Sequence, residues 1–253
     1  MSKSMSSFQL VGYSERGVFN AVFHEICLSA TPVPLLRKLL ERIQFPGHSV
    51  QFEDITEVEV MIEQSLSDFG DADAIILYRN SRHRGAIFVE GKVKSCQRNR
   101  WTTTSEWNAF KKGTMTIKKL SSSNLFTQLY HKVRFVSSLK EEGIEKLEAG
   151  VPFPACSTKA VRKIGNNGVV RKAVKKIAQH LTEVHFVSVL PRTPEDAQPF
   201  FEKPLDLSHS VPLDGWSVEN WGYLYWQEVE EFCKENGLKH ALGVFEFNEG
   251  QIY

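Results

Sequence analysis

The pattern of hydrophobic and polar positions predicts several short strands between helices. Residues 58–66 alternate between apolar and polar side chains, and 71–79 and 85–93 are apolar runs, so all three segments are expected to be strands. Only the short polar segment NSRHRG separates the last two, which favours an antiparallel hairpin. A fourth strand is expected at 182–190, where a strongly apolar run ends before a proline.

Apolar residues at helical spacing predict helices before and after these strands. In the first helix, Val18, Val22 and Ile26 recur on one face. Ser14 is expected to cap the start of that helix, and Gly237 to end the last one. The expected helices are 14–30, 32–43, 125–139, 168–181 and 221–237, and residues 240–248 are expected to close the chain as a strand.

These elements predict an α/β fold, a three-layer sandwich with a mixed central β-sheet flanked by helices. Neither GxGxxG nor GxxxxGK[ST] occurs, and consecutive strands joined by hairpins do not suit a doubly wound nucleotide-binding sheet. Residues 141–168 have the composition of a loose connector, but they do not require a second domain. We expect one domain over 1–253, with its core at about 14–191 and residues 192–253 as an elaboration.

Composition, charge and cysteine spacing exclude several classes of protein. The 253 residues are 42% hydrophobic, enough for a sizeable core, and the net charge is +1, so any nucleic-acid site must be a local patch. The four cysteines lie far apart, which argues against structural zinc or a disulfide framework and suits a reducing compartment. With no signal peptide and no apolar run near the roughly 18 residues of a membrane span, we expect a cytoplasmic protein without a membrane partner.

Charged residues in two of the strands point to chemistry. Asp71 and Asp73 begin one strand, and Glu90 and Lys92 lie near the end of the next. Burying a carboxylate without a partner is costly. Side chains alternate along a strand, so Glu90 and Lys92 share a face, and the hairpin can bring the two aspartates beside them. Oxygen ligands of this kind suit Mg²⁺, with Mn²⁺ as a substitute.

An exposed edge strand is the alternative explanation for this pattern. There, Glu90 and Lys92 would simply face water without any function. Phe88 lies on the same face of the strand and argues against full exposure.

The motif formed by Asp73, its following apolar run and the triplet Glu90-Gly91-Lys92 resembles the PD-(D/E)xK nuclease superfamily, which has the restriction-endonuclease-like fold. Alanine stands where the family usually has proline before the aspartate, a position that varies widely. The resemblance covers about 14–135 and implies that Asp73 and Glu90 ligate the metal. Lys92 would then position or deprotonate the attacking water. Asp71 shares a face with Asp73 and stays open as a supporting or alternate ligand.

Two further family positions have candidates on the helices. The family often carries a glutamate on the helix before the first strand, and Glu15 fits its early placement better than Glu25. Glu15 can equally be a first-turn acid that favours the helix dipole. The family also often has Gln and Lys one turn apart after the triplet, and Gln128 and Lys132 match, although an ordinary solvated helix face would give the same spacing.

This resemblance implies a Mg²⁺-dependent nuclease that hydrolyses phosphodiester bonds of DNA rather than RNA. The implied role is in restriction, repair or defence, and the resemblance is compatible with a homodimer. One alternative is a catalytically inactive nucleic-acid-binding or assembly module. Another is a coincidental triplet in an unrelated α/β protein, in which Asp73 and Glu90 would lie apart. The expected catalytic residues are Asp73, Glu90, Lys92, Gln128 and Glu15, of which Asp73, Glu90 and Glu15 would bind the metal.

Overall fold

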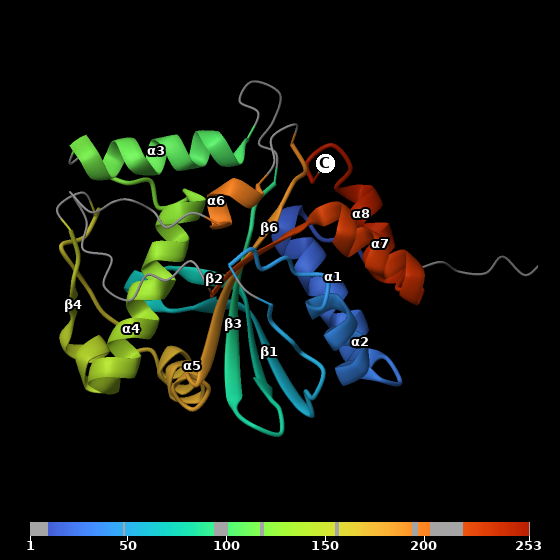
Figure 1. The fold of residues 1–253 in the computed structure, drawn as a ribbon, viewed down its shortest axis with the longest axis horizontal. Helices are drawn as coiled ribbons and strands as arrows, with labels where there is room; N and C mark the ends of the chain where they lie inside the picture. The colour runs from blue at the N-terminus through green and yellow to red at the C-terminus, as the bar shows by residue number, and fades with distance from the viewer. Residues whose placement is uncertain are drawn as a thin grey trace, which may run out of the picture.

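A mixed five-stranded sheet forms the centre of the molecule (Figure 1). The computed structural model describes residues 10–47, 49–93, 101–116, 119–154, 157–193, 197–202 and 220–252. In spatial order the strands are β1 (Glu57–Ser65), β2 (Asp71–Arg79), β3 (Arg84–Gly91), β6 (Glu183–Leu190) and β7 (Trp221–Tyr225). A separate small ribbon pairs β4 (Val151–Pro152) with β5 (Val161–Arg162).

The strand directions follow from the lengths of the connections. The first three strands are antiparallel neighbours joined by short turns, which confirms the expected hairpin between β2 and β3. The two later strands follow long helical connections and run parallel to β3. Because β3 lies in the middle of the sheet, the exposed edge strand considered for Glu90 and Lys92 is wrong.

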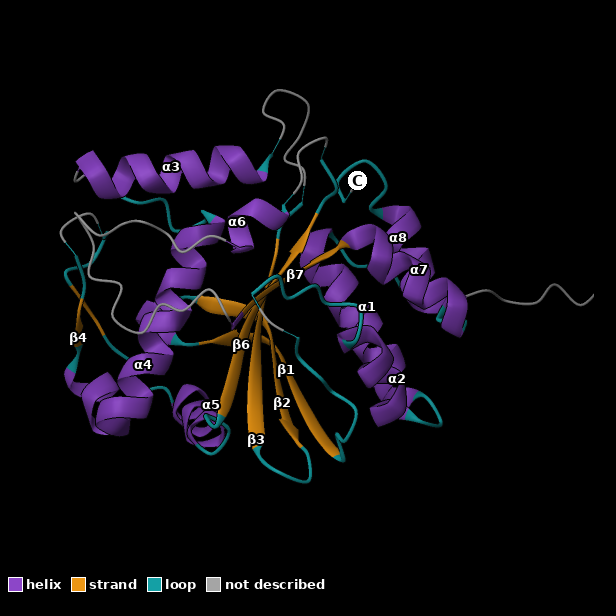
Figure 2. Ribbon diagram, viewed as in Figure 1, coloured by secondary structure: helices purple, strands orange, loops and turns teal. Residues whose placement is uncertain are grey.

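Helices cover both faces of the sheet, which confirms the expected α/β architecture (Figure 2). Each face has its own apolar core, built from the alternate side chains of the strands. One face packs against α1 (Ser14–Leu28), α2 (Pro32–Leu40), α7 (Trp226–Asn236) and α8 (Lys239–Phe247). The other packs against α3 (Thr103–Thr116), α4 (Leu125–Ala149), α5 (Gly168–Ala178) and α6 (Gln198–Glu202).

Two expectations for the C-terminal region are wrong. The segment 221–237, expected to be one helix, begins as strand β7, since its first five residues are buried and pair in parallel with β6. The segment 240–248, expected to be a strand, is helix α8, which buries Ala241, Val244 and Phe245 on one side. Short buried runs carry too little periodicity to separate strand from helix. The fifth strand of the main sheet therefore comes from the region expected to be an elaboration.

The helix ends are set partly by distant residues. Ser14 is the first residue of α1 with φ of 57°, not its N-cap, and its N–H donates to Asn248 Oδ1 at 2.7 Å. Asn248 also donates to the carbonyl of Gly12 at 2.8 Å, so the end of α8 fixes the start of α1. Gly237 ends α7 in the left-handed region, as expected.

The connections hold more regular structure than their composition suggested. Helix α3 occupies the polar stretch before α4, and α4 itself continues to Ala149 with a kink at Gly143. The end of α4 and the β4–β5 ribbon lie within the segment expected to be a loose connector. Asn124 caps α4 by accepting from Thr127 N at 3.1 Å. These elements frame the charged residues of β2 and β3.

Candidate active site

Asp73 and Glu90 lie side by side because of the register between β2 and β3. The last paired residues at this end are Ala74 and Val89, and one step further along the same register Asp73 faces Glu90. Asp73 Oδ2 accepts a hydrogen bond from Gly91 N at 2.7 Å, which ties the aspartate to the neighbouring strand. The alternative in which the two carboxylates lie apart is therefore wrong.

Glu90 is fully buried and faces α4. Its Oε1 lies 2.7 Å from Nζ of Lys132, whose side chain is 0% exposed. Glu90 Oε2 is also buried, and no hydrogen-bond partner for it occurs in the part of the chain that the structure describes. Ser188, which lies beside Glu90 on β6, likewise has a buried Oγ without a hydrogen-bond partner among the described residues. A buried carboxylate oxygen without a donor is costly, so this point of the site suits a cation.

The electrostatics of Asp73 point the same way. Burial raises the pKa of the Asp73 carboxyl to about 7, the charge of Glu90 adds to this rise, and Glu15 contributes more weakly. The hydrogen bond from Gly91 and the ammonium of Lys92 oppose it. A carboxyl whose ionisation is opposed by burial and by a neighbouring carboxylate is a common feature around a divalent metal ion, whose charge would favour its ionised form. The residues present therefore fit a hard cation.

Lys92 follows the end of β3 and is held from several directions. Its backbone N–H donates to Val189 O at 2.9 Å, and its carbonyl accepts from Trp226 Nε1 at 2.7 Å. Its Nζ donates to Gln128 Oε1 on the first turns of α4. The structure therefore brings Lys92 and Gln128 together, and the lysine reaches the site with its backbone fixed.

Glu106 is a site neighbour that sequence reasoning missed. It lies on α3, in a polar stretch to which the sequence assigned no element, and its carboxylate accepts from Leu125 N at 2.6 Å at the start of α4. Burial raises the pKa of Glu106, while the hydrogen bond from Leu125 and the charge of Lys92 oppose the rise. The spacing of polar residues gave no signal for it, because the contact depends on α3 lying across the start of α4 (Figure 1).

The structure separates the two candidate glutamates of α1. A Cβ placed on Gly91 would lie 3.1 Å from the Cβ of Glu15, so Glu15 borders the end of β3. Glu25 instead accepts from His240 N at 3.3 Å and Ala241 N at 2.9 Å, and thereby caps α8. Only Glu15 is placed to take part in the site.

Asp71 takes part through its backbone. Its side chain is exposed, while its carbonyl accepts from Nζ of Lys132 at 2.8 Å. Lys132 is buried, so the solvated helix face considered for it is wrong.

Among the residues that the structure describes, no three Asp, Glu, His or Cys side chains come close enough together to hold a metal ion as they stand. Two carboxylates converge, and Glu15 stays near them.

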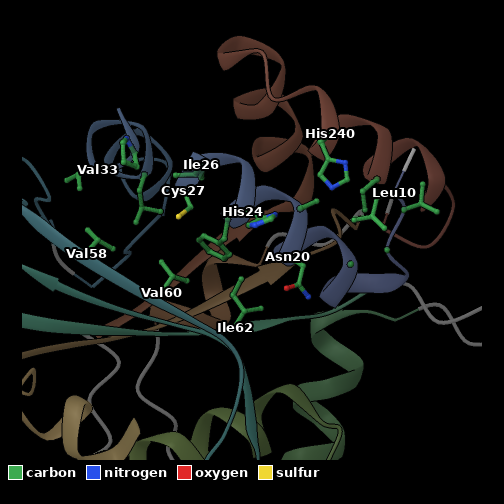
Figure 3. Close-up of a pocket in the computed structure, with 18 residues that line it drawn as sticks. Leu10, Asn20, His24, Ile26, Cys27, Val33, Val58, Val60, Ile62 and His240 are labelled. Atoms are coloured by element: carbon green, nitrogen blue, oxygen red, sulfur yellow. The ribbon is translucent and has the colours of Figure 1, made fainter. Parts of the chain in front are cut away.

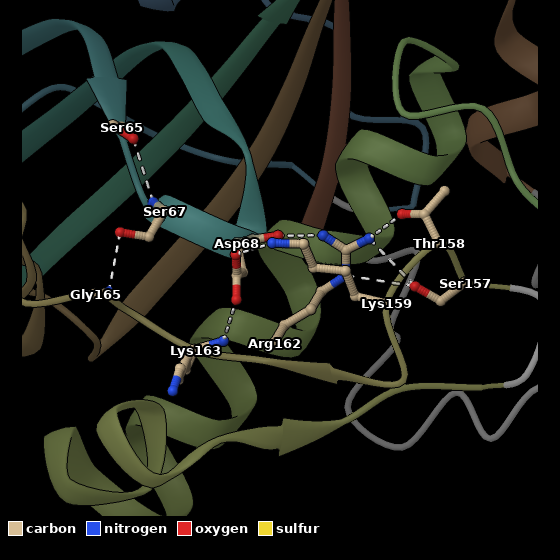
Figure 4. A network of polar contacts seen from close by, with 9 residues as sticks. All are labelled: Ser65, Ser67, Asp68, Ser157, Thr158, Lys159, Arg162, Lys163 and Gly165. Atoms are coloured by element: carbon tan, nitrogen blue, oxygen red, sulfur yellow. Dashed lines mark hydrogen bonds and ion pairs between the residues drawn. The ribbon is translucent and has the colours of Figure 1, made fainter.

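The turn before β2 is fixed by a polar network (Figure 4). Arg162 of β5 is 5% exposed and donates to the carbonyl of Asp68, in the 3₁₀ turn η1 (Ser67–Phe69), and to Ser157 Oγ. The Asp68 carboxylate pairs with Lys159 and accepts from Lys163 N. The network holds the chain immediately before the strand that carries Asp73.

A cavity of about 750 Å³ lies elsewhere, between α1, α8 and β1 (Figure 3). It opens on the face of the sheet opposite to α4, and most of its wall is apolar, with Asn20, His24 and His240 as polar neighbours. None of the expected site residues lines it. The cavity therefore has no part in the carboxylate site.

Comparisons with known proteins identify no family for this chain. No protein-family model, no curated protein and no solved structure matches it. Within the described ranges no helix is both long and apolar enough to cross a membrane. Any function must therefore rest on the site itself.

Proposed function

We propose that this protein is a Mg²⁺-dependent nuclease of the PD-(D/E)xK type with a restriction-endonuclease-like fold. The observation that carries the proposal is the meeting of Asp73 and Glu90 at one end of the β2–β3 hairpin, with Lys92 just beyond Glu90. The order of elements supports it: a helix, three antiparallel strands, a helix behind them and a strand parallel to the third.

Each residue has a chemical task in this proposal. Asp73 and Glu90 would hold the ion, and Glu15 borders them as a further ligand. Bound there, Mg²⁺ supplies positive charge to the phosphate and favours ionisation of the attacking water. Lys92 would position or deprotonate the attacking water, and Gln128 orients its ammonium through the amide oxygen.

The proposed substrate is DNA rather than RNA, in a restriction, repair or defence role in the cytoplasm. The net charge of +1 gives no field over the whole molecule, so phosphates would be bound by local basic residues. We therefore expect DNA binding to weaken as salt concentration rises, with a slope set by the number of phosphates contacted.

Cleavage assays test the proposal. Supercoiled plasmid, linear duplex, single-stranded DNA and RNA are incubated with Mg²⁺, Mn²⁺ or EDTA. We expect cleavage of DNA with either metal, none with EDTA, and a loss on the order of 10²-fold or more in Asp73→Ala and Lys92→Ala. Glu59→Gln, which changes an exposed carboxylate of β1, is the matched control and should cleave normally. Cleavage that survives both site substitutions would overturn the assignment.

A catalytically inactive nucleic-acid-binding module is the second candidate. The observation in its favour is that, in the described part of the chain, Glu90 is already paired with a lysine and no group of three metal-ligating side chains has formed. Retained DNA binding in gel-shift experiments, without cleavage in either metal, would support this candidate over the nuclease.

A further inference from the structure

Lys132 has an unusual environment for a lysine. Its side chain is 0% exposed, and lysine is almost never fully buried unless it is paired. Three oxygens surround its Nζ: Glu90 Oε1 at 2.7 Å, the carbonyl of Asp71 at 2.8 Å and the carbonyl of Phe69 at 3.5 Å. An ammonium has three hydrogens to donate, so this set of acceptors satisfies it completely.

The three oxygens around Lys132 are also ligands of the kind that a hard divalent cation prefers. One carboxylate oxygen and two backbone carbonyls resemble the donor sets of Ca²⁺ or Mg²⁺ sites in proteins. They come from β3 and from the start of β2 with the turn before it, so a positive charge here ties together the two strands that carry Asp73 and Glu90.

The packing around Lys132 keeps its ammonium in this place. Gly70, with φ of 83°, turns the chain beside the ammonium, and a Cβ placed on it would lie 3.4 Å from Nζ, in ordinary contact. One turn earlier on α4, Gln128 binds Lys92. The same helix therefore positions the ammonium groups of both Lys92 and Lys132, and a shift of α4 would disturb both contacts.

We propose that Lys132 is a positioning residue whose ammonium takes the place of a second metal ion beside Glu90, so that the site binds one divalent cation. That cation would lie between Asp73 and Glu90 Oε2, the buried oxygen without a donor among the described residues. Lys132 holds Glu90 by its other oxygen and presents Oε2 toward Asp73. The inference rests on the proposed function for the location of the metal.

Counting bound ions tests this inference. Mn²⁺ is titrated into the metal-free protein and followed by calorimetry and by the free-Mn²⁺ electron paramagnetic resonance signal. Glu90→Gln identifies the ions that belong to the site. We expect one Glu90-dependent ion per chain in the wild type. Lys132→Ala opens the oxygen-lined space and should bind two, whereas Lys132→Met, which fills the space with an apolar chain, should bind one.

The outcomes separate the inference from the proposed function. Two Glu90-dependent ions in the wild type, or one ion in both lysine variants, would overturn the role of Lys132 and leave the nuclease intact. One ion without cleavage of any substrate would overturn the nuclease alone. No bound ion at millimolar Mn²⁺ would overturn both. Circular dichroism checks that both lysine variants fold, and a count of two Glu90-dependent ions in the wild type would overturn the role of Lys132 even if they do not.

Discussion

The carboxylates of Asp73 and Glu90 lie together at the open end of the β2–β3 hairpin, but different groups compensate their charges. Glu90 has the ammonium of Lys132 as a counter-ion, whereas Asp73 has one backbone donor and the more distant charge of Lys92. The cost of placing two negative charges together therefore falls mainly on Asp73, through burial and the charge of Glu90.

The pKa of Asp73 predicts how the metal-free protein responds to pH. Its folded-state value of about 7 lies above its ordinary 3.8, so between these values the folded protein keeps a proton that the unfolded chain has released. The resulting stability is complete below about pH 4 and is lost as pH rises through 7. In EDTA, wild type should lose stability relative to Asp73→Asn as pH rises from about 4 to 7, with little further change above pH 7, measured by urea denaturation. Parallel pH profiles would contradict this.

The two glutamates of α1 should respond differently to the same substitution. Glu25→Gln weakens the cap of α8 and should cost about 1 kcal/mol of unfolding free energy, with Mn²⁺ affinity unchanged. Glu15→Gln removes a carboxylate beside the site and should weaken Mn²⁺ binding with little change in stability. Calorimetry and thermal denaturation of both variants check the pair, and equal Mn²⁺ affinities in the two would exclude Glu15 as a ligand.

At the scale of elements, the site depends on how the start of β2 is held. Lys132 of α4 contacts this segment, and Arg162 of β5 binds the turn before it. The small β4–β5 ribbon, outside the main sheet, thereby supports the strand that carries Asp73. Its residues belong to the segment that composition alone assigned to a connector.

Removing Arg162 should loosen this segment. Arg162→Met leaves the Asp68 carbonyl and the Ser157 hydroxyl without their buried donor, which should cost about 2–4 kcal/mol of unfolding free energy. Lys163→Met, at the exposed neighbouring position, is the control and should change stability by less than about 0.5 kcal/mol. Urea denaturation measures both. Equal midpoints for the two variants would show that the network contributes little.

At the scale of the whole molecule, elements from both ends of the chain meet at Gly91. A Cβ there would lie 2.8 Å from Cε2 of Phe19 on α1 and 3.2 Å from Cζ2 of Trp226 on α7. The middle residue of the Glu90-Gly91-Lys92 triplet is therefore small because two helices pack directly over it, and this packing also brings Glu15 to the end of β3.

Gly91→Ala should disturb both stability and the site. Overpacking at this junction is expected to cost about 1–3 kcal/mol of unfolding free energy, and displacement of α1 should weaken Mn²⁺ binding. Gly168→Ala is the matched control, because a Cβ at the start of α5 meets nothing within 4 Å, and it should be neutral or slightly stabilising. Unfolding and Mn²⁺ titration of both variants compare them, and equal results would contradict the close packing at Gly91.

The sequence by itself determined the local features whose physical signals are local. Alternation predicted β1, apolar runs predicted β2 and β3, and the short polar turn predicted the antiparallel pairing of β2 with β3, which places Asp73 opposite Glu90. Helical spacing predicted α1, α2, α4 and α5, and an asparagine before α4 supplied its cap. Pattern alone therefore brought Asp73, Glu90 and Lys92 together, whereas Gln128 was predicted only through the family resemblance.

Only the tertiary structure decided which residues surround that group. The burial of Lys132 against Glu90, the position of Glu106 and the choice between Glu15 and Glu25 depend on contacts between elements far apart in the chain. The tertiary structure also decided that β7 is a strand and α8 a helix. A short buried run fits either periodicity until it packs against a neighbouring strand or helix. Long-range packing leaves no repeating signal in the sequence, so it becomes visible only in the folded chain.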